Sequence, residues 1–169
     1  MLTEQYRREA EERYASLQFS DDFLFCKILT ENEVFDVEMQ TTRQKNLPKR
    51  SRYYQRMIDL NLINRGDDFK KLKKSFVIFI CMSDPFPGYN RCIYRFENVC
   101  REESRLVLGD ETYKVFLNAD GTRGDVSDEL KDFLHLLRDG YGKSCIWITF
   151  IKHNNFKSLY LFILKQKMH

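Results

Sequence analysis

Residues 34–42 read VFDVEMQTT, and the alternation in this stretch decides the expected fold. Because successive side chains of a strand point to opposite faces, the pattern predicts a strand over about residues 34–41 with one apolar and one polar face. The polar face carries two carboxylates and an amide, from Asp36, Glu38 and Gln40. Two interpretations stay open: a solvent-exposed strand face, or a site that binds a metal ion through oxygen ligands.

The metal-site interpretation assigns a role to each polar group. Sites for hard divalent ions use carboxylate and carbonyl oxygens, and the bound ion can activate water for phosphodiester hydrolysis. Glu38 and Gln40 are then the candidate catalytic residues, and the candidate ligands are Glu38, Asp36 and the backbone carbonyl of Met39. Asp36 and Glu38 are two residues apart, about 6.5–7 Å along a strand, so two flexible carboxylates could in principle share an ion.

A strongly basic segment follows the polar strand. Residues 43–74 contain eleven basic and three acidic residues, although the net charge of the whole chain is only +3. Clustered Lys and Arg can replace the counterions of a polyanion, so this segment predicts DNA binding; a solvated helix face is the alternative. The candidate DNA-binding residues are Lys45, Lys49, Arg50, Arg52, Arg56 and Tyr54.

Hydrophobic patterning predicts an α/β (α+β) domain with a mixed sheet flanked by helices. Expected helices cover residues 3–17, 20–29 with Ser20 as N-cap, 46–66, and a stretch from Asp125 or Ser127 to Gly140. Expected strands cover residues 34–41, 75–82, 92–100 and 113–119, with a turn at 84–90.

Length and cysteine usage set the remaining limits. A chain of 169 residues suits one domain, and five cysteines without a CxxC pair or a secretory signal favour a cytoplasmic, reducing setting. Residues 141–169 form an atypical basic and apolar tail with five lysines and no acid. Its apolar runs CIWITFI and LYLFIL are each shorter than the ~20 residues that span a bilayer, so no membrane association is expected.

The order of several blocks resembles the Rpn family of recombination-promoting nucleases and putative transposases, within the PD-(D/E)XK nuclease superfamily. These blocks are RYASLQFSDDFLFCKILTEN, EMQTTRQKNLPKRSRYYQRMIDLNLINRG, FICMSDPFPGYNRCIYRFENVC, KVFLNADGT and VSDELKDFLHLL. The resemblance implies a restriction-endonuclease-like core and a Mg²⁺-dependent DNA endonuclease associated with recombination or transposition.

The resemblance also implies individual roles. Glu38 would be the metal-binding acid, and Gln40 would stand at the superfamily's catalytic lysine position. Arg50 and Tyr54 look like the family's R-x-x-x-Y element, which would orient the site or touch phosphate; core packing is the alternative for Tyr54. Asp22 would match an N-terminal motif, with helix-dipole electrostatics as the alternative.

The chain departs from the family pattern near residues 33/34. The family places a helix and two strands there, one of which carries a second metal-binding Asp, and we expect this segment to be deleted because Glu33 runs directly into Val34. The expected domain, residues 1–140, is therefore a truncated core in which the central strand FVIFIC lacks some of its cover and a sheet edge is exposed. That edge predicts a homo-oligomer or pairing with an intact relative, and the tail looks like an altered reading frame.

Two functions follow from these observations. The first is a metal-dependent DNA endonuclease whose activity is impaired or lost in this chain. The second is a non-catalytic DNA-binding or interaction remnant of a mobile-element protein.

Overall fold

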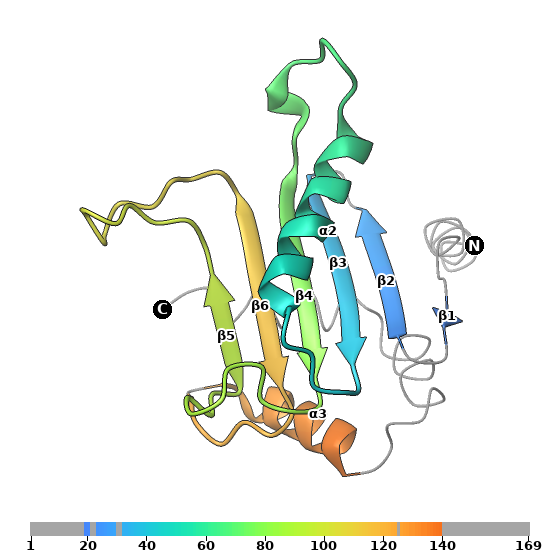
Figure 1. The fold of residues 1–169 in the computed structure, drawn as a ribbon, viewed down its shortest axis with the longest axis vertical. Coiled ribbons are helices and arrows are strands. Elements are labelled where there is room, and N and C mark those ends of the chain that lie inside the picture. Colours follow the sequence, from blue (N-terminus) through green and yellow to red (C-terminus); the bar gives the residue numbers. More distant parts are fainter. Residues whose placement is uncertain (1–18, 21–22, 30–31, 125, 140–169) are drawn as a thin grey trace, which may run out of the picture.

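A six-stranded mixed sheet forms the centre of the protein (Figure 1). The structure is a computed structural model that describes residues 19–20, 23–29, 32–124 and 126–139. The strands lie in the order β1-β2-β3-β4-β6-β5. Their bounds are β1 Phe19–Ser20, β2 Phe23–Leu29, β3 Glu33–Gln40, β4 Lys74–Cys81, β5 Ile93–Phe96 and β6 Thr112–Asn118. The helices are α2 Leu47–Leu62, the short 3-10 helix η1 Phe69–Lys71, and α3 Asp128–Arg138.

Strand directions follow from the connections. β3, β4 and β6 are parallel neighbours, whereas β2 runs antiparallel to β3 and β5 antiparallel to β6. Parallel strands require a crossover, and α2 supplies it between β3 and β4. Figure 1 shows α2 laid across one face of the sheet. The predicted α/β class with a mixed sheet flanked by helices is confirmed.

The two faces of the sheet pack against different helices. Phe35, Val37 and Met39 of β3 belong to the core cluster that contains the apolar residues of α3. Val34 of β3 belongs to the other cluster, which contains Leu47 and Ile58 of α2. Since side chains alternate along a strand, the polar residues of β3 share the face that α2 covers.

The expected helix over residues 20–29 is wrong. Residues 23–29 form β2, which pairs with β3 from Phe23 opposite Gln40 to Leu29 opposite Val34. Short apolar runs such as FLFCKIL do not by themselves distinguish a helix from a strand, and here the pairing with β3 decides.

The expected loss of cover over the central strand is wrong. The expected exposed edge is not contradicted, because β1 pairs only with Phe23 and Leu24 of β2 and leaves the outer side of the rest of that strand without a neighbour in the described sheet. β4 has β3 and β6 on its two sides, and Phe76 to Ile80 are at most 1% exposed. The edges of the described sheet are β5 on one side and, on the other, β2 with the two-residue strand β1 beside its first two residues.

The other predicted elements are confirmed with shifted ends. The strand predicted at 34–41 is β3, the helix predicted at 46–66 ends at Leu62, and the strand predicted at 92–100 is only Ile93–Phe96. Ser127 is the N-cap of α3. The predictions for residues 3–17 and 141–169 lie outside the described residues. Within the described part of the chain, no helix has the length and apolar character that crossing a membrane requires.

Candidate active site

The polar face of β3 is buried. Asp36, Glu38 and Gln40 are 4%, 2% and 2% exposed. The interpretation of this strand as having a solvent-exposed polar face is therefore wrong. Burying carboxylates is unfavourable unless they are paired, so the partners of these side chains determine what the site can do.

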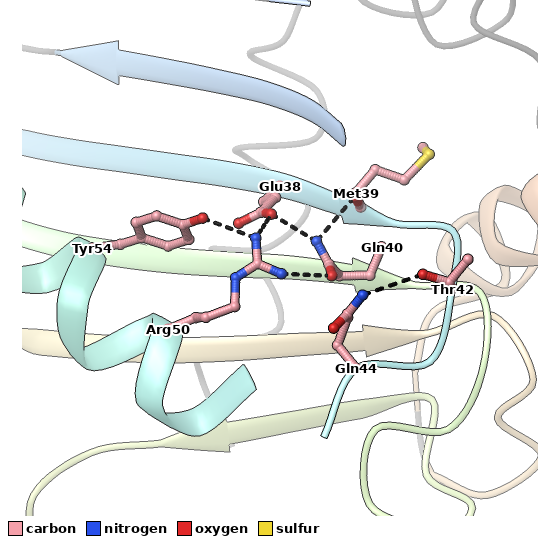
Figure 2. Close-up of polar contacts among 7 residues, drawn as sticks. All are labelled: Glu38, Met39, Gln40, Thr42, Gln44, Arg50 and Tyr54. Carbon is pink, nitrogen blue, oxygen red and sulfur yellow. Dashed lines mark hydrogen bonds and ion pairs between the residues drawn. The ribbon is translucent and has the colours of Figure 1, made fainter. Parts of the chain in front are cut away.

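Arg50 reaches from the first turns of α2 onto Glu38 and Gln40 (Figure 2). Its Nη2 donates to Glu38 Oε1 in an ion pair, and its Nη1 donates to Gln40 Oε1 at 2.8 Å. Gln40 Nε2 in turn donates to Glu38 Oε1 at 2.7 Å and to the carbonyl of Met39 at 3.2 Å. Arg50, Glu38 and Gln40 therefore form a closed triangle of hydrogen bonds. Glu38 Oε1 accepts from both of the other residues, and Gln40 Oε1 accepts from Arg50.

Tyr54 and Phe79 complete the surroundings of the guanidinium. Arg50 Nη2 donates to Tyr54 Oη at 2.9 Å, and Arg50 Cζ lies 5.6 Å from the Tyr54 ring centroid and 5.8 Å from that of Phe79. Such placement adds cation–π attraction to the ion pair. The position of Tyr54, one helical turn after Arg50, explains the contact.

The local charges shift the pKa values of Arg50 and Tyr54. Burial by itself would lower the pKa of Arg50, but the hydrogen bond with Tyr54 and the charge of Glu38 raise that pKa overall. Burial raises the pKa of Tyr54, and the charge of Glu38 adds to the increase against the opposing contact with Arg50. At neutral pH the site therefore contains a cationic guanidinium and a neutral phenol.

The donor set does not fit the Mg²⁺ site that the resemblance implies. Glu38 Oε1 is held by a guanidinium and an amide, and Gln40 Oε1 is also bound by Arg50. The other oxygen, Oε2, is buried and lacks a hydrogen-bond partner among the described residues, but it is a single ligand. The neighbouring strand β2, FLFCKIL, has no acid, and the described residues contain no group of three His, Cys, Asp or Glu suited to a metal ion.

Among the described residues of β3, Asp36 is the only other acid on the strand face that carries Glu38, so it is the remaining candidate for a second metal ligand from this strand. Its backbone pairs with Lys27 of β2 and Val77 of β4, whereas Glu38 pairs with Phe25 and Phe79. The two acids are thus offset along one strand rather than brought together from two strands. Asp22, the N-terminal candidate, lies outside the described residues.

The predicted DNA-binding residues divide into two groups. Lys45, Lys49, Arg52 and Arg56 are exposed, so their side chains are available to a polyanion. Arg50 and Tyr54 are partly buried and bonded to each other. The structure therefore places Arg50 at the Glu38 site, where the resemblance gave it an orienting role, rather than on the outer surface.

Sequence reasoning missed two supporting contacts. Phe79 lies within an unbroken apolar run and had no signal that set it apart from its neighbours. Gln55 of α2 donates to Ser75 Oγ of β4 at 2.7 Å, and both residues are buried. The position of Gln55 four residues after Ser51, on the inner face of α2, was the available signal for a buried polar residue.

A buried acid and amide on a central strand, covered by a basic helix in a mixed α/β sheet, are the arrangement that the resemblance to PD-(D/E)XK nucleases leads us to expect. Residues 6–159 match the family described as PD-(D/E)XK nuclease family transposase, and because the match spans most of the chain, the chain belongs to that family. Searches of curated proteins and of solved structures found no match. The match confirms the family resemblance, supports a nuclease-like function and implies a DNA substrate.

Proposed function

We propose that this chain is a DNA-binding member of the PD-(D/E)XK nuclease family transposases in which phosphodiester hydrolysis is impaired. One observation carries the proposal: the carboxylate at the expected catalytic position, Glu38, is held by Arg50 and Gln40 inside the protein. A guanidinium bound to this carboxylate neutralises the charge that would attract a divalent cation.

The geometry of the acids supports the same proposal. Hydrolysis by this class requires the reacting groups to be positioned within about an ångström. Asp36 and Glu38 occupy positions two residues apart on one strand, and β2 brings no carboxylate beside them. We attribute this difference to the proposed deletion near residues 33/34, which would remove the strand that carries the family's other acid.

DNA binding is proposed from exposed charge. Lys45, Lys49, Arg52 and Arg56 are exposed at the start and along the outside of α2. Each phosphate that such residues neutralise releases condensed counterions, so the affinity for DNA should fall steeply as salt rises. A gel shift that is absent, or that does not respond to salt, contradicts this part of the proposal.

Plasmid nicking tests the catalytic part. Supercoiled plasmid is incubated with excess folded protein and Mg²⁺, and wild type is compared with Glu38→Gln, which keeps the side-chain size. We expect the plasmid to stay intact with both proteins while both still shift DNA. Mg²⁺-dependent nicking by wild type that Glu38→Gln abolishes would show instead that the chain is an active metal-dependent endonuclease.

Protein partners and location form a separate part of the proposal. As an interaction remnant the chain would pair with a second copy or with an intact relative. We also propose a cytoplasmic location, which the cysteine pattern of the sequence favours. Because β2 lies beside β3, any pairing through the described sheet would use the β5 edge or the edge of β2 that β1 leaves open. Co-purification with an intact family member, compared with sedimentation of the chain alone, tests this part.

A further inference from the structure

The outer face of α2 combines exposed apolar and basic side chains. The face that packs on the sheet contains the buried residues Leu47, Ser51, Gln55 and Ile58. On the opposite side, residues at three- and four-residue spacing form a continuous row, because such residues are neighbours on a helix. This row, called the outer stripe, consists of Lys49, Arg52, Tyr53, Arg56 and Leu60.

Tyr53 is the aromatic centre of the outer stripe. Its side chain is 59% exposed, and Leu60 further along the stripe is 73% exposed. Lys49 precedes Tyr53 by four residues, Arg56 follows it by three, and Arg52 is adjacent. Single exposed apolar residues are common on proteins, so the three surrounding cations, rather than exposure alone, distinguish this tyrosine.

Few acids oppose these cations. Within α2 the only acid is Asp59, and its Oδ1 accepts a hydrogen bond from Gln55 Nε2 at 3.1 Å. The outer stripe therefore presents positive charge on both sides of an aromatic ring.

We propose that the outer stripe binds single-stranded DNA, with a base stacked on Tyr53 and phosphates contacted by Lys49, Arg52 and Arg56. In a duplex the faces of the bases are covered by their neighbours, so an exposed ring has no base face to stack on. In a single strand every base offers a face, and surfaces that combine stacking aromatics with cations are the usual way to bind it. This inference rests on the proposed function, since it specifies which form of DNA the chain prefers.

The outer stripe is connected to the Glu38 site. The Tyr53 and Tyr54 ring centroids are 5.8 Å apart in an edge-to-face arrangement, and Tyr54 Oη accepts the hydrogen bond from Arg50. Arg50 in turn binds Glu38. A strand stacked on Tyr53 would therefore lie one aromatic ring away from the group of side chains around Glu38.

Fluorescence anisotropy with the full chain tests the proposal. One labelled oligonucleotide is used single-stranded and as a duplex with its complement, and a 2-aminopurine version reports base stacking by loss of fluorescence. Tyr53→Ala is compared with Tyr53→Phe, which keeps the ring. Tyr89→Ala is the matched control, because Tyr89 is 65% exposed and belongs to the turn region between β4 and β5 rather than to α2.

The expected result has three parts. Wild type binds the single strand more tightly than the duplex and quenches 2-aminopurine. Tyr53→Ala weakens single-strand binding by at least about fivefold and removes the quenching, with a smaller effect on the duplex. Tyr53→Phe and Tyr89→Ala behave like wild type.

Other results overturn the inference. Equal losses for Tyr53→Ala and Tyr89→Ala, or equal effects of Tyr53→Ala on both DNA forms, exclude stacking on Tyr53. A change of sedimentation in Tyr53→Ala without DNA would assign the stripe to a second copy of the chain. These outcomes are distinguishable from failure of the proposed function, which would appear as no salt-dependent binding of either DNA form, or as Glu38-dependent nicking.

Discussion

Replacing Arg50 by Met should destabilise the protein strongly, because Glu38 would remain buried without its cation. The Glu38 side chain is 3% exposed and that of Arg50 is 21% exposed, so the pair is largely shielded from water. Arg50→Met removes hydrogen bonds to Glu38, Gln40 and Tyr54. Breaking one side of a buried ion pair costs about 3–5 kcal/mol, and the partial exposure of Arg50 puts the expected loss near the lower end.

A double-mutant cycle isolates the contribution of the pair. Once Arg50 is gone, neutralising Glu38 as Gln removes the uncompensated charge, so the double variant should be less destabilised than the sum of the two single variants. We expect a coupling energy of at least about 1 kcal/mol. Arg56→Met is the matched control, since Arg56 is an exposed arginine of the same helix and should change stability by less than about 0.5 kcal/mol.

Urea unfolding followed by far-UV circular dichroism gives each free energy of unfolding. The four proteins of the cycle and the Arg56→Met control should show similar m-values, because the surface exposed on unfolding is the same. If Arg50→Met costs no more than Arg56→Met, or if the two single effects add without coupling, the buried triangle of Arg50, Glu38 and Gln40 does not exist as described.

Two further predictions concern the rest of the fold. Gly121→Ala should cost about 1–3 kcal/mol in urea unfolding, because a Cβ there would lie 2.5 Å from Cys92 Cα and 2.7 Å from Arg91 O. Gly109→Ala would meet nothing within 4 Å, but its φ of +74° should still cost about 1–2 kcal/mol in backbone strain. A loss below about 1 kcal/mol for Gly121→Ala would contradict the close backbone approach. Burial, then the charges of Asp84 and Glu38, raise the pKa of Cys81 from 9.0 to about 12. The folded state thus holds the Cys81 thiol proton more tightly than the unfolded state does. The stability that this protonated thiol contributes is therefore fully present below pH 9 and is lost as pH rises through about 12. Between these two pH values, the free energy of unfolding of wild type should fall by roughly 1.4 kcal/mol per pH unit more than that of Cys81→Ala. Parallel plots of unfolding free energy against pH for the two proteins would refute this prediction.

The successes and failures of the sequence reasoning have physical causes. The alternation in residues 34–41 predicted β3, and the apolar stripe after Asn46 predicted α2, because both patterns match one period over many residues. The helix expected over residues 20–29 failed because that run is short and apolar, and its hydrogen-bond partner, β3, supplies the deciding contacts. The alternation of polar residues on β3 was equally compatible with a face exposed to water and with a face covered by a helix. Periodicity shows which side chains share a face of the strand, but not what packs against that face.

The sequence by itself determined the family, the mixed α/β class, and the presence of Glu38, Gln40, Arg50 and Tyr54 as a candidate group, because these depend on local pattern and on the order of motifs. Only the tertiary structure decided that the polar face of β3 is buried, that β2 fills the edge beside it, and that Arg50 turns inward onto Glu38 while Tyr53 stays outside. These outcomes depend on contacts between strands and a helix that are distant in the sequence, and no local periodicity encodes which side chain a buried charge will meet.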